Sequence, residues 1–105
     1  MAFRRFKGIK LPEQKQGKLF FLLQNYSDEP YQTQMKVVRL CDEIAGEHAA
    51  ALFELLTRSR SVTITQVSMR YYISETMLNR YRRRFYEAWY KNRRRGEPSA
   101  AESVR

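Results

Sequence analysis

The chain has 105 residues, a formal net charge of +9 at pH 7 and a single cysteine. This length fits one domain with one modest core, and the lone Cys41 excludes an internal disulfide, which suits a reducing cytoplasm. The apolar run at residues 19–23 is shorter than the roughly 7 apolar residues of a signal peptide and the roughly 20 of a membrane span, so we expect a cytoplasmic protein.

The charge is distributed unevenly along the chain. Residues 1–18 carry six basic groups and one acid, residues 19–55 two basic groups and six acids, and residues 56–95 eleven basic groups and two acids. Soluble helices normally mix both signs, so a one-sided basic excess indicates an anionic partner such as nucleic acid. The acidic middle is expected to face protein or solvent.

Residues 1–11 combine basic and apolar side chains and are predicted to form a basic N-terminal arm. Such a segment either frays or follows the backbone or minor groove of DNA. Its candidate DNA contacts are Arg4, Arg5 and Lys7.

A helical domain is expected over residues 12–95. Its first three helices are predicted over residues 12–25, 31–45 and 47–57, with Gly46 ending the second. Apolar residues recur in each at three- and four-residue steps, which predicts one buried stripe per helix. The stripes consist of Leu19, Leu22, Leu23 and Tyr26; of Val37, Leu40, Cys41 and Ile44; and of Ala49, Leu52, Phe53 and Leu56.

Residues 63–90 predict a helix-turn-helix, a motif whose second helix lies in the DNA major groove. Thr63 and Gln66 match a capping box at the start of the first helix, and Ser74 occupies the N-cap position of the second. The turn often has glycine, which takes a positive φ without strain, but here Tyr72 occupies that position. Either the turn has another shape, or Tyr72 is mildly strained.

Apolar side chains define an inward face for both helices of this motif. They are Ile64, Val67 and Tyr71 on the first helix, Ile73 in the turn, and Leu78, Tyr81, Phe85 and Trp89 on the second. The opposite face of the second helix carries side chains that can read base edges: arginine pairs with guanine, asparagine with adenine, and the threonine methyl packs on that of thymine. The candidate base contacts are Ser74, Glu75, Thr76, Asn79, Arg80 and Arg83.

Further polar side chains are expected to hold phosphates and set the register on DNA. They are Arg60, Thr63, Thr65, Arg70, Arg82, Arg84, Lys91 and Arg94. The second helix of the motif should extend to about residue 95, and residues 96–105 should form a disordered tail. Phe85, Tyr86, Trp89 and Tyr90 cover more than one helix face, which predicts a homodimer contact.

The order of these segments resembles the PapB/FaeB group of small regulators of fimbrial adhesin operons. The matching residues are Leu11-Pro12, Lys18-LFFLL-Gln24, Ala50-ALFELLT-Arg58 and Ile64 to Phe85. Two features depart from the group: residues 27–46 look like an acidic insertion, and the loop RSRSV lacks a Gly-His-Ser type of sequence. The helix-turn-helix followed by an aromatic-rich helix, here RFYEAW, is also similar to the KorA/TrfB plasmid repressors. The first resemblance implies transcription regulation by oligomeric binding to AT-rich operator DNA.

Other functions stay open beside DNA binding. An RNA-binding module could stack unpaired bases on tyrosines. These are Tyr71, Tyr72, Tyr81 and Tyr86. A protein-interaction module could instead dock a partner on the acidic middle. An enzyme has the least support, because His48 has no evident nucleophile beside it and no residues match metal-ligand spacing.

The sequence thus predicts an all-α protein: a small helical domain with a C-terminal helix-turn-helix and an extended last helix. The leading functional prediction is a sequence-specific, oligomeric, nucleoid-associated regulator that binds double-stranded DNA. No catalytic residue, metal, cofactor, membrane contact or small-molecule effector is expected.

Overall fold

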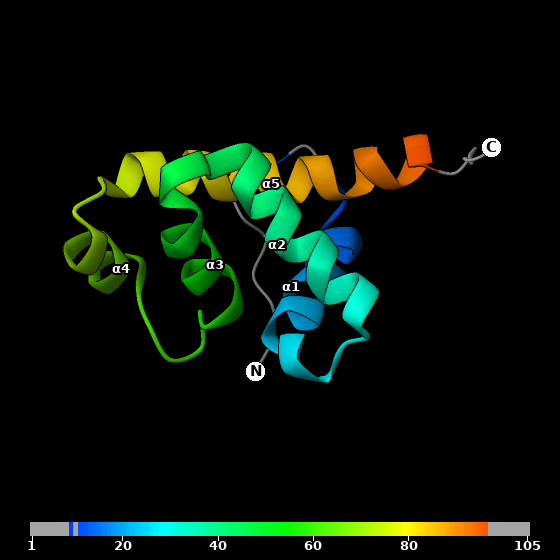
Figure 1. The fold of residues 1–105 in the computed structure, drawn as a ribbon, viewed down its shortest axis with the longest axis horizontal. Coiled ribbons are helices and arrows are strands. Elements are labelled where there is room, and N and C mark those ends of the chain that lie inside the picture. Colours follow the sequence, from blue (N-terminus) through cyan, green and yellow to red (C-terminus); the bar gives the residue numbers. More distant parts are fainter. Residues whose placement is uncertain (1–8, 10, 97–105) are drawn as a thin grey trace.

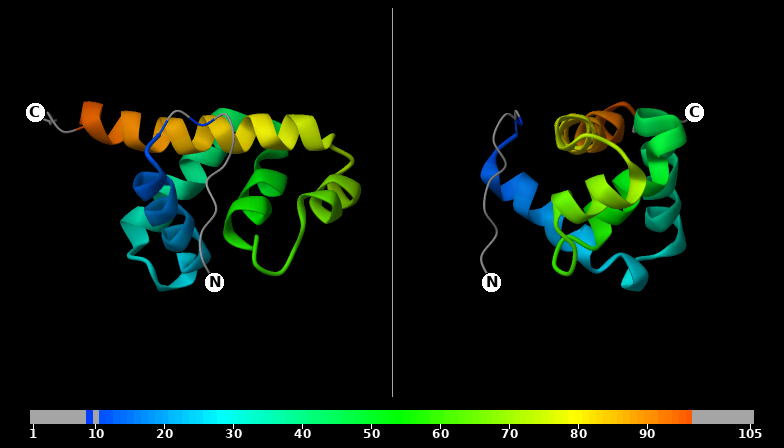
Figure 2. Two further views of the ribbon diagram at one scale, coloured as in Figure 1. Left: turned by 180° about the vertical axis from the view of Figure 1, so that it is seen from behind. Right: turned by 90° about the vertical axis from the view of Figure 1, so that its left-hand side faces the viewer.

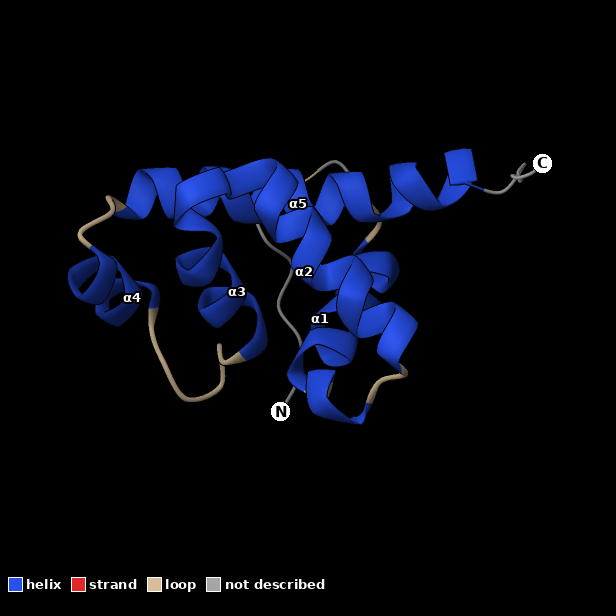
Figure 3. Cartoon of the chain, viewed as in Figure 1, coloured by secondary structure: helices blue, strands red, loops and turns tan. Residues whose placement is uncertain are grey.

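The computed structural model describes residues 9 and 11–96, and the side chains among them up to residue 91. This part of the chain consists of α-helices, short 3₁₀ turns and loops and contains no strand (Figure 3). The all-α fold expected from the sequence is therefore confirmed. No helix within these residues combines the length and the apolar character that crossing a membrane would require.

Five α-helices follow one another along the chain. They are α1 (Glu13–Gln24), α2 (Tyr31–Ala45), α3 (Ala49–Thr57), α4 (Ile64–Tyr71) and α5 (Glu75–Gly96). The 3₁₀ turns Tyr26–Asp28 and Gly46–His48 join α1 to α2 and α2 to α3. Gly46 ends α2, as expected, with a φ of 54°, in a region of backbone conformation that favours glycine.

The helix α5 runs along the length of the molecule. Its 22 residues span about 33 Å at the usual rise per residue. The other helices lie below or beside it, so that one side of α5 stays uncovered in all three views (Figures 1 and 2). The helix α4 lies near its N-terminal end, α1 lies nearer its C-terminal half, and α3 lies between them (Figure 1).

Two clusters of buried side chains hold these helices together. The large cluster joins α1, α2 and α3 to the middle of α5. Its buried members include Leu19, Leu23, Val37, Leu40, Leu52, Leu56, Phe85, Tyr86 and Trp89. The small cluster joins α3 and α4 to the first turn of α5 and consists of Ala51, Leu55, Val67, Ile73 and Leu78. The helix-turn-helix therefore has its own small core, and α3 contributes side chains to both clusters.

Most aromatic residues of α5 are buried within the chain. Phe85, Tyr86 and Trp89 are at most 5% exposed, because α1 and α2 cover the two sides of α5 on which they lie. The expectation that the rings of Phe85, Tyr86, Trp89 and Tyr90 exceed what one chain can bury was wrong for the first three, whereas Tyr90 is half-buried. The aromatic content of α5 therefore no longer supports a homodimer contact.

The end of the predicted N-terminal arm belongs to the folded domain. Ile9 is buried in the large cluster, and Leu11 packs against it. Gln16 of α1 is also buried, and its side-chain amide donates to the carbonyl oxygen of Leu11. The arm residues Arg4, Arg5 and Lys7 lie outside the described residues, as do the side chain of Arg94 and residues 97–105 of the predicted tail.

Candidate nucleic-acid interface

Local hydrogen bonds define the start of both helices in the motif. The Thr63 hydroxyl accepts from the backbone N–H of Gln66, and the Gln66 side chain accepts from the N–H of Thr63. This capping box satisfies two N–H groups that have no partner within the helix. Ser74 caps α5 by accepting from the backbone N–H of Met77. The helix starts that the sequence predicts are therefore confirmed.

The turn between α4 and α5 contains the strained residue that the sequence indicates. Tyr72 has φ 57° and ψ 46°, which is the left-handed conformation, and its side chain is 94% exposed. Ser68 secures this turn: its backbone oxygen accepts from the N–H of Ile73, and its hydroxyl donates to the oxygen of Ile73. Ile73 is thereby directed into the small cluster. The turn thus keeps a glycine-type geometry without glycine.

The buried stripe of α5 determines which of its faces is free. Leu78, Tyr81, Phe85 and Trp89 are all buried, as expected. Tyr81 also shares a hydrogen bond with His48 at the start of α3, with 3.1 Å between Oη and Nδ1. Because these contacts hold one side of α5 against α2 and α3, the side that carries Thr76 and Arg80 faces solvent.

The six candidate base contacts are exposed, but three of them already have protein partners. The hydroxyl of Ser74 caps α5, Glu75 accepts a 2.9 Å hydrogen bond from Thr65 of α4, and Asn79 accepts a 2.6 Å bond from Arg82. The three exposed residues without such bonds to described residues are Thr76, Arg80 and Arg83. They recur at four- and three-residue steps along α5, so they form one stripe on the uncovered side.

Some of the candidate phosphate contacts are exposed, and others already contact other residues of the protein. Arg84 and Lys91 are exposed on α5 and flank the same stripe. Thr63 and Thr65 lie at the start of α4, where Thr63 is used in the capping box. Arg94 belongs to α5 by its backbone.

Arg82 has a different environment from its neighbours. Its side chain is half-buried beside Tyr86, and burial lowers the pKa of the guanidinium. The Nη2 atom donates to Asn79, one turn before it. Arg82 is therefore a poorer candidate for phosphate than Arg83 or Arg84, because binding would have to compete with these contacts.

Arg60 lies apart from the other candidates. Its guanidinium is 5.7 Å from the centre of the Phe21 ring on α1. The loop that carries it lies at the far end of α3 and α4 from α5 (Figure 1). Gln24 of α1 contacts this loop and the end of α3, because its side chain donates to the Ser59 hydroxyl and to the backbone oxygen of Leu56. Arg60 is thus not brought together with the α5 residues.

Glu54 is a functional candidate that the sequence reasoning missed. This buried residue of α3 forms an ion pair with Arg70 and accepts a 2.9 Å hydrogen bond from the Tyr71 hydroxyl. The hydrogen bond to Glu54 raises the pKa of Tyr71. Arg70, a candidate phosphate contact, is therefore tied to α3. The sequence contains a signal for this residue, because Glu54 is the only charged residue in the apolar segment Ala49–Thr57.

The described residues contain no group of three or more histidine, cysteine or acidic side chains that could hold a metal ion. Comparisons with protein-family models, with curated proteins and with solved structures find no match to this chain. The resemblance to the PapB/FaeB group, and that to the KorA/TrfB repressors, therefore stays a prediction.

Proposed function

We propose that this protein is a sequence-specific regulator of transcription that binds double-stranded DNA with the uncovered side of α5. The observation that carries the proposal is the exposure of Thr76, Arg80 and Arg83 on one side of a helix whose other side is buried. A recognition helix needs this combination, since its base-reading side chains must enter the groove while the rest of the protein holds its axis.

Thr76 and Arg80 of the stripe, and the basic residues beside it, have distinct parts in this proposal. Arg80 is the leading candidate for a guanine contact, because its side chain is exposed in the second turn of α5 and its guanidinium can donate two parallel hydrogen bonds. The methyl group of Thr76 can pack on that of thymine. Arg84 and Lys91 would contact phosphates, which position the protein without distinguishing sequences.

The experiment compares Arg80→Ala with Arg84→Ala. Sites are first selected from a randomised duplex pool, and both variants are then titrated with the selected duplex and with a random duplex at several salt concentrations. Arg80→Ala should lower discrimination between the duplexes by about 1–3 kcal/mol. Arg84→Ala should weaken both duplexes alike and reduce the salt slope by about one counterion.

Equal losses on both duplexes for Arg80→Ala would contradict base reading by α5. The control is Arg39→Ala, which removes an exposed arginine from α2 and should leave discrimination unchanged. The symmetry of the selected sites would also report whether the protein binds as an oligomer, because half-site spacing reflects dimer geometry.

The RNA-binding alternative has less support than the tyrosine content of the sequence indicated. Of the tyrosines proposed to stack on bases, Tyr81 and Tyr86 are buried and Tyr71 is bonded to Glu54. Of these four, only Tyr72 is available as a stacking platform. Competition between duplex DNA and single-stranded RNA separates the two functions, and tighter RNA binding would favour the alternative.

A further inference from the structure

Glu75 is the one acidic residue among the six candidate base contacts of α5. It lies in the first turn of the helix, next to Thr76 of the exposed stripe, and its side chain is exposed. The positive end of the helix dipole favours a negative charge there, but the same charge repels DNA phosphates. An acid at this place therefore lowers the affinity for DNA unless its carboxylate contacts a base.

The carboxylate of Glu75 is tied to the neighbouring helix of the motif. The Thr65 hydroxyl of α4 donates a 2.9 Å hydrogen bond to Oε2 of Glu75, and the two residues are ten positions apart in the sequence. This bond restricts the rotation of the Glu75 side chain. The other carboxylate oxygen, Oε1, accepts from none of the residues that the structure describes, so it can accept from a ligand.

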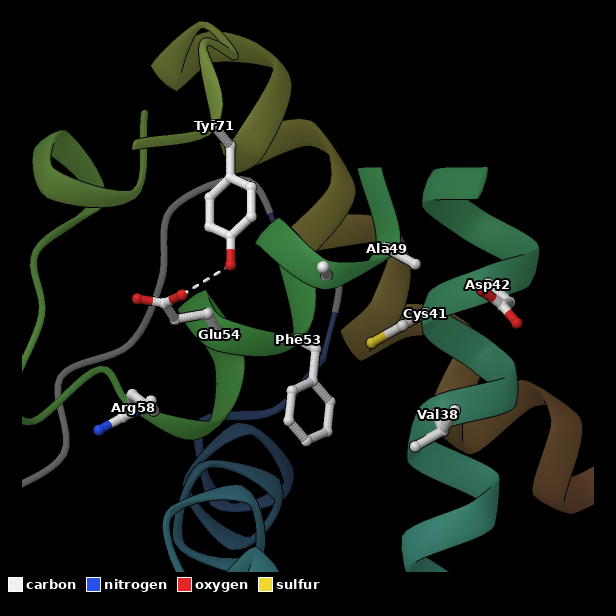
Figure 4. Close-up of a pocket in the computed structure, with 9 residues that line it drawn as sticks. Val38, Cys41, Asp42, Ala49, Phe53, Glu54, Arg58 and Tyr71 are labelled. Carbon is white, nitrogen blue, oxygen red and sulfur yellow. Dashed lines mark hydrogen bonds between the residues drawn. The ribbon is translucent and has the colours of Figure 1, made fainter. Parts of the chain in front are cut away.

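Thr65 can hold this carboxylate in place because α4 is itself fixed to the domain. Val67 of α4 is buried in the small cluster, and the capping box defines the first turn of α4, in which Thr65 lies. At the other end of α4, the Tyr71 hydroxyl points to Glu54 of α3 and donates to it, at the edge of the pocket in Figure 4. These contacts keep the Thr65 hydroxyl in one place beside the first turn of α5.

A carboxylate in the major groove distinguishes bases by the hydrogen-bond donors that they present. Only cytosine and adenine present an amino group there, through N4 and N6, whereas guanine and thymine present acceptors. The adenine amino group lies beside the acceptor N7, which repels a carboxylate, so cytosine is the better partner. Guanine or thymine at the same position would leave a desolvated carboxylate facing acceptors, and this cost disfavours the wrong sequence.

We propose that Glu75 accepts from the N4 amino group of a cytosine in the major groove, and that Thr65 is the residue that positions its carboxylate. The inference rests on the proposed DNA-binding function and adds the base that the first turn of α5 selects. Without the bond to Thr65, the Glu75 side chain would lose more rotational freedom on binding, which would reduce the discrimination. Arg80, one turn further along α5, remains the candidate for guanine.

The test measures the affinity for duplexes in which one base pair at a time is exchanged, starting from a site that the wild type selects from a randomised pool. At one position of each half-site, the wild type should prefer cytosine by at least about fivefold over the other bases. Glutamine donates as well as accepts and can pair with adenine. Glu75→Gln should therefore lose the cytosine preference at this position, accept adenine there, and keep the preferences at all other positions.

A matched control separates base reading from the loss of a negative charge. Glu43→Gln removes the same charge from the exposed surface of α2 and should leave every base preference unchanged. If Glu75→Gln instead binds all duplexes more tightly by the same factor, Glu75 only repels phosphates, and the proposal is rejected.

The role of Thr65 is tested with two variants. Thr65→Val removes the hydroxyl but keeps the shape of the side chain, whereas Thr65→Ser keeps the hydroxyl. The valine variant should lower the cytosine preference by at least about twofold, and the serine variant should retain it. An equal loss of affinity for every duplex would mark Thr65 as a phosphate contact and overturn its positioning role. The hydrogen bond joins two exposed side chains, so both variants should fold, which circular dichroism checks.

The outcomes also distinguish this inference from the proposed function. If the wild type binds no duplex, or binds duplexes without selecting a sequence, both fail. If it selects a sequence and Glu75→Gln leaves the base preference at every position unchanged, only the assignment of Glu75 fails, because Arg80→Ala still tests base reading by α5.

Discussion

The helix-turn-helix half and the half built from α1, α2 and the middle of α5 are stabilised in different ways. The first has a small apolar cluster supplemented by local hydrogen bonds: a capping box, a serine N-cap and the bonds of Ser68 across the turn. The second has no side-chain cap at the start of α1 or α2. It has other side-chain hydrogen bonds, such as those that Gln34 donates to the oxygens of Tyr26 and Glu29, and a larger cluster with several aromatic rings. At the edge of this cluster, the Lys36 ammonium lies 3.9 Å from the centre of the Trp89 ring.

This difference shows how one helix can serve two purposes. The middle of α5 is held by contacts that bury its aromatic residues on two sides, whereas its first turns are held by one small cluster. The half with the large cluster therefore fixes the axis of α5, and the first turns of α5 can expose a polar stripe.

The largest effects come from truncating one residue in each cluster. Phe85→Ala should lower the free energy of unfolding by about 3–5 kcal/mol, and Leu78→Ala by about 2–5 kcal/mol, because both side chains are fully buried. Hydrogen exchange distinguishes them: Phe85→Ala should expose amides throughout, whereas Leu78→Ala should expose α4 while sparing α2. Identical exchange patterns for the two variants would show that the halves unfold as one unit.

High pH should destabilise the half with the large cluster. Burial raises the pKa of Cys41 from 9.0 to about 12, so the folded state disfavours the thiolate that the unfolded chain forms. Stability is therefore complete below pH 9 and falls as the pH rises from 9 towards 12, by up to about 1.4 kcal/mol per pH unit. Denaturant unfolding at pH 8 and pH 10.5 measures this fall, and Cys41→Ala should reduce it. An unchanged slope in that variant would assign the effect to other groups, such as Tyr86.

The capping box should have a smaller and more local effect. Thr63→Ala should lower stability by about 1 kcal/mol, because the Gln66 N–H loses its acceptor. Thr63→Ser keeps the hydroxyl and serves as the control. Thermal unfolding gives the difference between the two variants, and a serine variant as unstable as the alanine variant would argue that the methyl group of Thr63 matters instead.

The smallest effect concerns the turn. Tyr72→Gly and Tyr72→Ala both remove an exposed ring, so their difference reports the backbone alone. The glycine variant should be more stable by about 0.5–1 kcal/mol, since the left-handed conformation costs alanine more than glycine loses in entropy. Chemical denaturation of both variants measures this difference. If alanine is equally stable, the turn has relaxed to another conformation.

Much of the helix-turn-helix could be predicted from the sequence, because its signals act over three or four residues. The pair Thr63 and Gln66 and the cap at Ser74 each define a helix start, and the spacing from Leu78 to Trp89 defines the buried side of α5. The exposure of Thr76, Arg80 and Arg83 follows from that spacing. The same reasoning left two possibilities for the turn, another shape or a strained Tyr72, and the structure has the positive φ at Tyr72.

The tertiary structure alone decided which neighbouring helix covers each remaining surface. The spacing of Tyr86 and Arg82 on α5 does not reveal that other helices cover Tyr86 or that burial perturbs Arg82. The ion pair of Glu54 with Arg70 joins residues sixteen positions apart. Such contacts depend on how α1, α2 and α3 pack, and helical periodicity contains no information about the partner. Sequence thus determined where the helices of the motif begin and which side is apolar, while packing determined which polar residues stay free.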